Sequence, residues 1–336
     1  MNTPHISIAL CTYKGSKYIQ EQLESIRNQS LQPSEIIICD DSSPDSTLEI
    51  INAFEAPFPI KVYVNSPALG TIKNFEKAIT LCEGDLIFLC DQDDFWPSNK
   101  LEVMTNYLQE NPQTMVLFSN ALLVDEHLNS LNDNLWEKVR FRQQQQEQWR
   151  AGASFDILLE GNRVTGCALA IRKVFVSQVL PFPAHISNKF IHDAWIALVA
   201  SITNSIDFIN ENLVWYRQHP LQQVGTRAQL PPKKITLKDR LTRPQSEKTA
   251  PFREKSAYYK SILDYINAHF SYTPEQLAPL IRAYNHYNLR AELPSNRLKR
   301  IIPVVKNYLK GNYHHYLDIE ANKYGIYLAI LGDLLE

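Results

Sequence analysis

The chain has 336 residues, of which 44% are hydrophobic and 21% are charged, a composition that is ordinary for globular proteins and excludes a disordered or fibrous chain. The net charge of −2 is unevenly distributed, because residues 226–336 carry 18 Lys and Arg against 10 Asp and Glu, a net +8 that leaves −10 for the rest. No run of about 18 apolar residues occurs and the N-terminal stretch has no basic region, so we expect neither a membrane-spanning helix nor a signal peptide.

Short apolar strands alternate with helical stretches in the first part of the chain. The pattern predicts four strands, at residues 5–11, 35–40, 60–65 and 85–91. It predicts helices between them, at residues 16–30, 46–54 and 70–81. Because the strands are apolar almost throughout, we expect an α/β fold with a parallel sheet that helices cover on both faces.

Beyond residue 96 the pattern is mixed. We expect a helix at 97–110, one or two strands within 114–126, and further strands at 167–172, 205–210 and 213–218. The Gln-rich stretch 140–150 predicts a mobile loop or an exposed helix. From about residue 229 the chain becomes basic and contains several prolines, so we expect an α/β domain over 1–228, a basic linker over 229–252 and a helical domain over 253–336.

The five cysteines are Cys11, Cys39, Cys82, Cys90 and Cys167. Their number is odd, most lie in apolar runs, and no CxxC pair occurs. We therefore expect buried, reduced thiols in a cytoplasmic protein.

A cluster of carboxylates follows the fourth predicted strand. Asp91, Asp93 and Asp94 fall within four positions, and carboxylates this close repel one another unless a positive charge lies among them. Parallel sheets bind ligands beyond the carboxyl ends of their strands, where Thr12 and Asp41 also fall. Hard oxygen ligands select Mg²⁺ or Mn²⁺, so this D-x-D predicts a divalent cation site, although acidic loops without a metal are common. Neither a GxGxxG fingerprint nor a P-loop occurs.

Seven motifs follow one another in order over residues 5–225: SIALCTYKGSKYIQEQLESIRNQ, IIICDDSSPDST, GTIKNFEKAI, FLCDQDDFWPSNKL, TGCALAIRK, HDAWIALVA and VWYRQH. With these motifs the chain resembles family 2 glycosyltransferases, which are inverting enzymes of the GT-A fold. It is especially similar to the bacterial rhamnosyltransferase-like subgroup. The resemblance implies a GT-A sheet in the first domain.

The resemblance also implies roles for the residues at the strand ends on the donor side. Thr12 and Tyr13 match residues that contact the nucleotide base, and Asp41 matches one that binds the base or ribose. Asp91 is expected near the ribose, while Asp93 is expected to hold the metal that binds the diphosphate. From the residues alone, Asp41 has a second interpretation as a cap of the following helix.

On the other side of the reaction, Asp193 of the HDAW motif matches the general base, although it could also cap the helix that it begins. Arg217 and His219 of the YRQH motif are expected to face the diphosphate, and His219 is a further candidate metal ligand. Thr165 and Gly166 line the acceptor side or only form a turn. These parts suit the reaction, because inverting transfer needs a carboxylate base and positive charge beside the leaving diphosphate.

We therefore expect an enzyme that transfers one sugar from a nucleoside diphosphate sugar, either dTDP-rhamnose or a UDP-sugar, to a glycan or lipid-linked glycan in surface polysaccharide assembly. The QxxRW motif of processive synthases is absent, which favours single addition. Gln222 stands where the subgroup commonly has Asn, which leaves the geometry of that loop open. The alternatives are a sugar-phosphate nucleotidyltransferase, for which CTYKGSKY is a poor phosphate loop, and a non-catalytic protein that binds nucleotide sugars.

The C-terminal stretch 296–317 mixes basic residues with Ile, Val, Leu and Tyr. Such a segment fits a peripheral contact with an anionic membrane, which for this family would be the cytoplasmic face of the inner membrane. The alternative is an ordinary helical domain whose basic face turns to the acidic part of the chain. Nucleic-acid binding is not expected, because the body of the chain is acidic.

Overall fold

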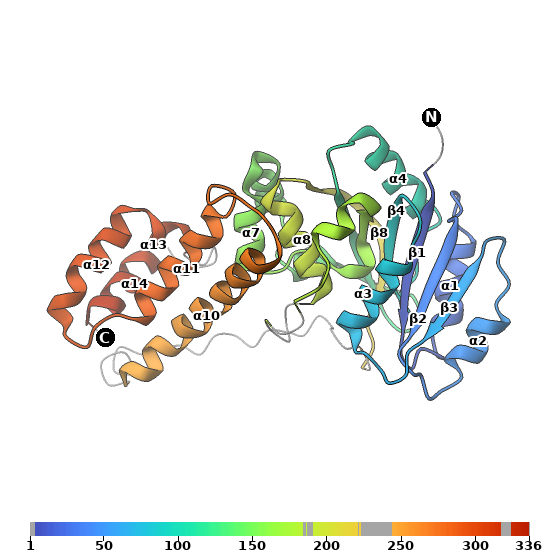
Figure 1. Ribbon diagram of the computed structural model, residues 1–336, viewed down its shortest axis with the longest axis horizontal. Coiled ribbons are helices and arrows are strands. Elements are labelled where there is room, and N and C mark those ends of the chain that lie inside the picture. The colour runs from blue at the N-terminus through green and yellow to red at the C-terminus, as the bar shows by residue number, and fades with distance from the viewer. Residues whose placement is uncertain are drawn as a thin grey trace. The chain divides into compact units, whose positions relative to one another are not determined.

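The computed structural model describes residues 4–183, 186, 191–220, 222, 244–316 and 324–335. The chain divides into two compact units, Met1–Arg227 and Ala228–Glu336 (Figure 1). Most of the expected linker 229–252 lies outside the described residues. Its last part differs from the expectation, because helix α10 begins at Gln245.

An eight-stranded mixed sheet forms the centre of the N-terminal unit, with the strand order β3-β2-β1-β4-β7-β5-β6 and with β8 paired to β5. The parallel half is the predicted one and comprises β1 (Ile6–Thr12), β2 (Glu35–Asp40), β3 (Ile60–Val64) and β4 (Leu86–Asp91). The other half comprises β5 (Val116–Val124), β6 (Ser130–Asn134), β7 (Leu169–Arg172) and β8 (Ile206–Arg217). Within it, β7 runs antiparallel to both β4 and β5.

The strand β8 differs from the sequence expectation of two strands at 205–210 and 213–218. It is continuous, and its residues 210–212 are exposed where its register against β5 shifts. These three polar residues interrupt the apolar pattern without interrupting the pairing, which is the effect of a β-bulge.

Helices pack around the sheet of the N-terminal unit. They are α1 (Ile19–Arg27), α2 (Thr47–Ala53), α3 (Thr71–Leu81), α4 (Lys100–Glu110), α5 (Leu135–Lys138), α6 (Gln143–Gln148), α7 (Ser154–Glu160) and α8 (His192–Ile202). The apolar side chains of α1 and α4 join one core cluster with alternate residues of β1, β2 and β4. Since successive strand residues point to opposite faces, α3, which contacts β1 and β2, covers the other face (Figure 1).

The Gln-rich stretch 140–150 contains helix α6, and the structure corrects the expectation that it is wholly exposed or mobile. Phe141 and Trp149, which flank the glutamines, are buried against Phe118 and Phe208. Their ring centroids lie 5.1–6.4 Å from those of Phe118 and Phe208. The aromatic residues thus anchor a segment that polar composition alone assigns to solvent.

All five cysteines are free and buried, which confirms the expectation of unpaired core thiols. None of the described helices is long and apolar enough to cross a membrane.

The C-terminal unit is helical in its described residues. Its helices are α10 (Gln245–His269), α11 (Ala278–Ala291), α12 (Arg297–Leu309), α13 (Asn312–His315) and α14 (Gly325–Leu335). Asp333 of α14 is buried and accepts two hydrogen bonds from Arg290 of α11, at 2.7 and 3.1 Å, and one from Tyr313. This bidentate ion pair fixes α14 to α11, because removing either partner would leave a buried charge.

Candidate functional site

The carboxyl ends of three parallel strands lie in one row at one edge of the sheet. In the strand register, Cys11 of β1 pairs with Cys39 of β2 on one side and with Asp91 of β4 on the other, and Thr12 pairs with Asp40. The acidic loops that follow β2 and β4 are therefore neighbours, as the sequence predicts for the ligand-binding edge of such a sheet.

The end of β1 is tied to the loop after β4. Thr12 is buried and its hydroxyl donates to Asp40 Oδ2 at 2.7 Å. The Tyr13 backbone N–H donates to Gln92 Oε1 at 2.8 Å, and the Tyr13 carbonyl accepts from Gln92 Nε2 at 2.9 Å. The Tyr13 side chain is left 41% exposed at this edge. Of the two expected base contacts, the Tyr13 ring is exposed, with Lys14 Nζ 5.1 Å from its centroid, whereas the Thr12 hydroxyl already has a partner within the protein.

The carboxylate of Asp41 is surrounded by donors from the protein itself. Its Oδ1 accepts from Asn65 Nδ2 at 2.9 Å and from the Leu69 backbone N–H at 2.6 Å, and its Oδ2 accepts from the Gly70 N–H at 2.8 Å. Asp41 thus holds the loop that begins α3 and does not cap α2. To bind the base or ribose, as the resemblance implies, the Asp41 carboxylate must accept hydrogen bonds from the ligand in addition to those from these three protein donors.

The D-x-D loop meets the end of β8 through an aspartate and a histidine. Asp93 Oδ2 lies 2.8 Å from His219 Nε2, and the His219 ring packs on Tyr18 with the centroids 4.8 Å apart. This separation is that of a hydrogen bond between the ring and the carboxylate. The side chain of Asp93 is partly exposed, so its carboxylate is able to hold a Mg²⁺ or Mn²⁺ ion that also contacts a ligand, with His219 beside it.

Arg217 differs from the expectation that it faces the diphosphate. It is 1% exposed, its Nε donates to the Asp93 carbonyl at 2.8 Å, and it donates to Glu21 Oε2 at 2.6 Å and to the Glu126 carbonyl. Its guanidinium also lies 4.6 Å from the centroid of the Tyr18 ring. Because its guanidinium is buried and donates to three protein acceptors, Arg217 supports the D-x-D loop from behind.

The turn after Arg217 is closed by Gln222, the residue that departs from the pattern of the resembling subgroup. Gln222 Nε2 donates to the Arg217 carbonyl, and Gln222 Oε1 accepts from the His219 N–H at 3.4 Å. The Arg217 N–H donates to Asp94 Oδ1 at 3.1 Å. The longer amide side chain therefore holds His219 at the D-x-D loop.

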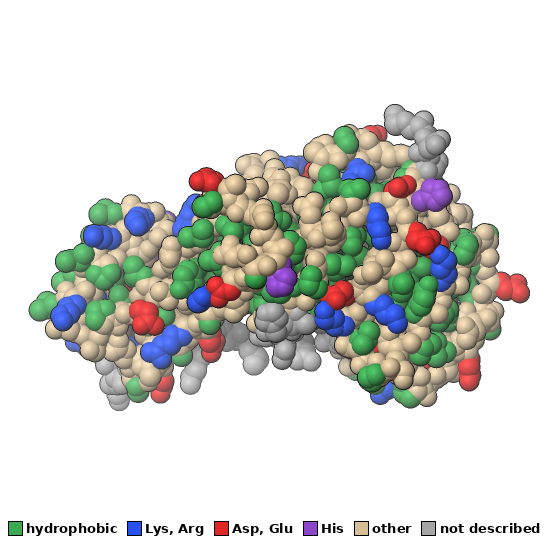
Figure 2. Space-filling view, in the orientation of Figure 1, with side chains coloured by type: hydrophobic (Ala, Val, Ile, Leu, Met, Phe, Trp, Pro, Cys, Tyr) green, Lys and Arg blue, Asp and Glu red, His purple; other side chains and the backbone are tan. Residues whose placement is uncertain are grey.

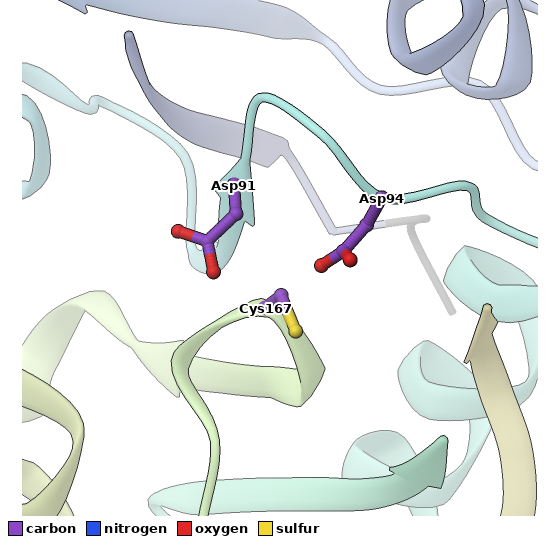
Figure 3. A group of neighbouring side chains, drawn as sticks. All are labelled: Asp91, Asp94 and Cys167. Atoms are coloured by element: carbon purple, nitrogen blue, oxygen red, sulfur yellow. The ribbon is translucent and has the colours of Figure 1, made fainter. Parts of the chain in front are cut away.

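Asp91, the first acid of the D-x-D, also forms a group with Asp94 and Cys167 (Figure 3). Their ligand atoms lie within 4.8 Å of one another. Burial, reinforced by Asp93, raises the pKa of Asp94 to about 7, and burial with the neighbouring carboxylates raises the pKa of Asp91 well above its usual range. Burial also raises the pKa of the Cys167 thiol, and sulfur is a soft ligand that Mg²⁺ and Mn²⁺ do not prefer. This group therefore fits a cation less well than the pair of Asp93 and His219.

Lys100 is the positive charge beneath this acidic group. It is fully buried, its Nζ donates to the Cys167 carbonyl at 3.2 Å, and it lies 4.6 Å from the Trp96 ring centroid. Burial lowers the pKa of Lys100 to about 8, with Asp94 among the groups that oppose the shift. Lys100 therefore partly compensates the buried carboxylates and at the same time fixes the turn Gly166–Ala168.

Asp193 lies in the first turn of α8, facing that same turn. Its Oδ2 accepts from the Gly166 N–H at 3.0 Å, and its Oδ1 accepts from Asn162 Nδ2 at 3.2 Å and from the Ala194 N–H. Burial raises the pKa of Asp193 to about 6, although all three hydrogen bonds favour the charged form. Asp193 also contributes to the raised pKa of Asp91, so the negative charges of the two carboxylates repel each other.

Gly166 and Thr165 form the turn that holds Asp193. A Cβ atom on Gly166 would lie 2.8 Å from His192 Nε2, so only glycine fits. The Thr165 carbonyl accepts from the Ala168 N–H at 3.0 Å, which makes Thr165 part of the turn. His192 is buried and stacks on Phe75 at 4.0 Å, and burial lowers its pKa to about 3, so it stays neutral. Gly166 and Thr165 therefore form the turn, and the contact of either with an acceptor stays a prediction.

The sequence reasoning missed Gln92, Lys100, Cys167 and Asn162. Gln92 stands between the two acids of the D-x-D. Only this position in the sequence indicated that it belongs to the site. Lys100 gives no signal, because lysine at the start of a predicted helix is normally exposed. Cys167 was assigned to the core, and its nearness to two carboxylates depends on long-range pairing of β7 with β4.

Substitution of Gly166 by alanine is expected to destabilise the N-terminal unit by about 1–3 kcal/mol, because the new methyl group must displace His192 or the turn. All five Trp residues precede residue 228, so fluorescence during chemical denaturation reports on this unit alone. Gly161→Ala is the matched control, since its Cβ would meet only the flexible end of Arg163, at 3.0 Å. Equal stability of both variants would contradict the role of the turn.

Replacement of Lys100 by methionine is expected to cost about 1–3 kcal/mol, because the Cys167 carbonyl loses its buried donor and Asp94 loses a nearby cation. Lys73→Met, which removes an exposed ion pair with Glu76, serves as the control and is expected to cost at most about 1 kcal/mol. The same fluorescence measurement checks both. A Lys100 variant no less stable than the control would show that the buried lysine compensates nothing.

Comparisons with known proteins agree with this geometry. The family model described as "Glycosyl transferase family 2" matches residues 7–175, just over half of the chain. The dTDP-rhamnosyl transferase RfbG of Shigella flexneri is 28% identical over 228 residues, which are 64% of this chain and 73% of that relative. An uncharacterized protein of Mycobacterium tuberculosis is 26% identical over 218 residues, and the chain spans 59% of its length.

Among solved structures, TarS 1–349 of S. aureus in complex with UDP-GlcNAc has a TM-score of 0.54 at 16% identity, with 95% of each chain covered. Its complex with UDP has a TM-score of 0.51 at 15% identity over the same share. These likenesses concern the fold and not the substrate. With the family match over residues 7–175, they show that the chain belongs to glycosyl transferase family 2 and has the GT-A fold.

Proposed function

We propose that this glycosyltransferase is an inverting, divalent-cation-dependent enzyme that moves one sugar from a nucleoside diphosphate sugar to a hydroxyl group of a glycan or lipid-linked glycan. The observation that carries the proposal is the Asp193 carboxylate. It is buried, held by three donors on a glycine turn, and lies in the electrostatic range of the acidic edge where a diphosphate would bind.

Asp193 is suited to act as the general base. With a pKa of about 6, the carboxylate is ionised at neutral pH and still basic enough to accept a proton. In the proposed reaction the acceptor oxygen attacks the anomeric carbon, and its proton passes to Asp193. The bond from that carbon to the diphosphate breaks, and the electron pair leaves with the nucleoside diphosphate.

Asp93 and His219 are the residues that would hold the cation, with Asp91 beside them. A bound Mg²⁺ or Mn²⁺ would supply positive charge for the leaving diphosphate. Arg217 contributes from behind, because its hydrogen bond to the Asp93 carbonyl fixes the loop that carries the ligand. This role as a positioning residue replaces the direct diphosphate contact that the resemblance implies.

For the donor we propose dTDP-rhamnose, supported by the similarity to the dTDP-rhamnosyl transferase RfbG, with a UDP-sugar as the alternative. The exposed Tyr13 ring is the side chain best placed to meet the base. We place the reaction in surface polysaccharide assembly in the cytoplasm, at the inner membrane, since five free, buried cysteines suit a reducing compartment.

The variant Asp193→Asn is expected to lose turnover by about 10²–10⁴-fold while it keeps donor binding, because the amide cannot accept the proton. Steady-state kinetics measure the turnover, and isothermal titration with the donor nucleotide measures the donor binding. Asp85→Asn is the matched control, since Asp85 is an exposed acid immediately before β4, far from its carboxyl end, and its carboxylate accepts the His5 N–H. Unchanged turnover in Asp193→Asn would remove the base assignment.

The pH dependence of turnover provides a further test. A base with a pKa of about 6 is active when deprotonated, so the rate is expected to be constant above pH 7 and to fall tenfold per pH unit well below 6. A pH–rate profile over pH 4.5–8.5 measures this fall in rate at acidic pH. A profile that stays flat down to pH 5 would contradict the buried base.

Thermal stabilisation by UDP, dTDP, GDP and CMP, each with and without Mn²⁺, identifies the donor nucleotide. A ligand at 100 times its Kd is expected to stabilise the N-terminal unit by about 2.7 kcal/mol. We expect the shift for one nucleotide, expected to be dTDP, to require Mn²⁺ and to disappear in Asp93→Ala but not in Asp85→Asn. A shift that needs no metal, or that survives in Asp93→Ala, would remove the metal proposal.

A further inference from the structure

Helix α12 turns its apolar side chains to solvent. Leu298, Ile301, Ile302, Val305 and Leu309 are between 43% and 76% exposed. At about 100° per residue these five positions share one face of the helix. The opposite face supplies Arg300, Val304 and Asn307, which are buried in the unit. A helix that packs in a globular domain has the reverse arrangement, with its apolar stripe inside.

Basic side chains flank this apolar stripe on both sides. At about 100° per residue, Lys299, Lys306 and Lys310 lie along one flank and Arg297 along the other. All four are exposed, and none forms an ion pair with another described residue. No acidic residue occurs between positions 293 and 316. The flanks therefore carry an uncompensated positive charge directly beside apolar surface.

Helix α14 adds a second exposed apolar stripe to the same unit. Tyr324, just before the helix, and Tyr327, Leu328, Leu331 and Leu335 within it are between 44% and 58% exposed. The other face of α14 packs, through Ile326 and Ile330 among others, against the small core that contains Val304 of α12. Figure 2 shows hydrophobic and basic side chains interspersed over the C-terminal unit. Exposed apolar surface that polar residues border marks an interaction site.

The basic surface continues from α12 onto α11. Lys310 and Arg282 line a pocket of about 390 Å³ together with Asn285 and Asn312. The described lining contains no acidic residue, so Arg282 adds positive charge beside the flank of α12. Phosphate oxygens are ligands for Arg, Lys and amide groups.

We infer that α12, with α14 beside it, is a docking surface for a membrane that carries anionic phospholipid. The exposed apolar stripe would enter the boundary between head groups and acyl chains, and the lysines would extend to the phosphates. A second copy of this chain fits less well, because a two-fold contact would bring the same basic flanks against each other. The inference of a membrane-docking surface follows from the geometry of α12 and α14. Only its purpose, which is access to a lipid-linked acceptor, rests on the proposed function.

The test is sedimentation of the full chain with vesicles of phosphatidylglycerol and phosphatidylcholine, and with vesicles of phosphatidylcholine alone. We expect sedimentation with the anionic vesicles that weakens at high salt. Lys299→Glu/Lys306→Glu is expected to weaken it at least tenfold, since each basic residue near an anionic surface contributes roughly fivefold. Ile302→Ser/Leu309→Ser is expected to abolish the part of the binding that resists salt.

Controls separate this inference from the enzymatic proposal. Arg253→Glu reverses an exposed charge on α10 and is expected to sediment like the wild type. All variants should keep the nucleotide-induced thermal shift of the N-terminal unit, so a loss of lipid binding alone concerns this surface only. Absence of wild-type sedimentation, equal binding by the Lys299→Glu/Lys306→Glu variant, or a dimer in light scattering that Ile302→Ser/Leu309→Ser dissociates would overturn the inference.

Discussion

The N-terminal unit depends on how it accommodates carboxylates that are crowded at the ends of its strands. Asp91, Asp93 and Asp94 lie within four positions, and Asp193 approaches them from α8. Such a group is stable only if cations or donors surround it. The fold brings these from distant segments, because β8 pairs with β5 and so carries Arg217 and the following His219 back to the end of β4.

The side chains around this site fall into two classes by burial. Buried side chains hold the loops in place, and exposed side chains are able to contact a ligand. Arg217 and Lys100 are fully buried and hold the D-x-D loop and the turn at Gly166. Asp93 and Tyr13 keep exposed surface at the edge of the sheet. The buried charged groups are desolvated, and they fix the positions of the exposed groups. Electrostatic catalysis requires groups that are held in position in this way.

The C-terminal unit has the opposite character. Its interior contains an ion pair between Arg290 and Asp333, whereas apolar side chains of α12 and α14 lie at its surface. The acidic catalytic unit and the basic helical unit thus differ in charge, which supports the different partners that we propose for them: a diphosphate held through a cation for the first, and an anionic surface for the second. This agrees with the charge asymmetry along the chain.

The sequence by itself determined the parallel half of the sheet, the row of acidic strand ends and the buried thiols, because apolar runs and their ends are local properties. Only the tertiary structure decided that Arg217 points inward, that Lys100 lies under Asp94, and that Asp41 serves a loop. It also decided which face of α12 is exposed. Periodicity shows which side chains share a face, but whether that face meets protein or solvent depends on partners from distant parts of the chain.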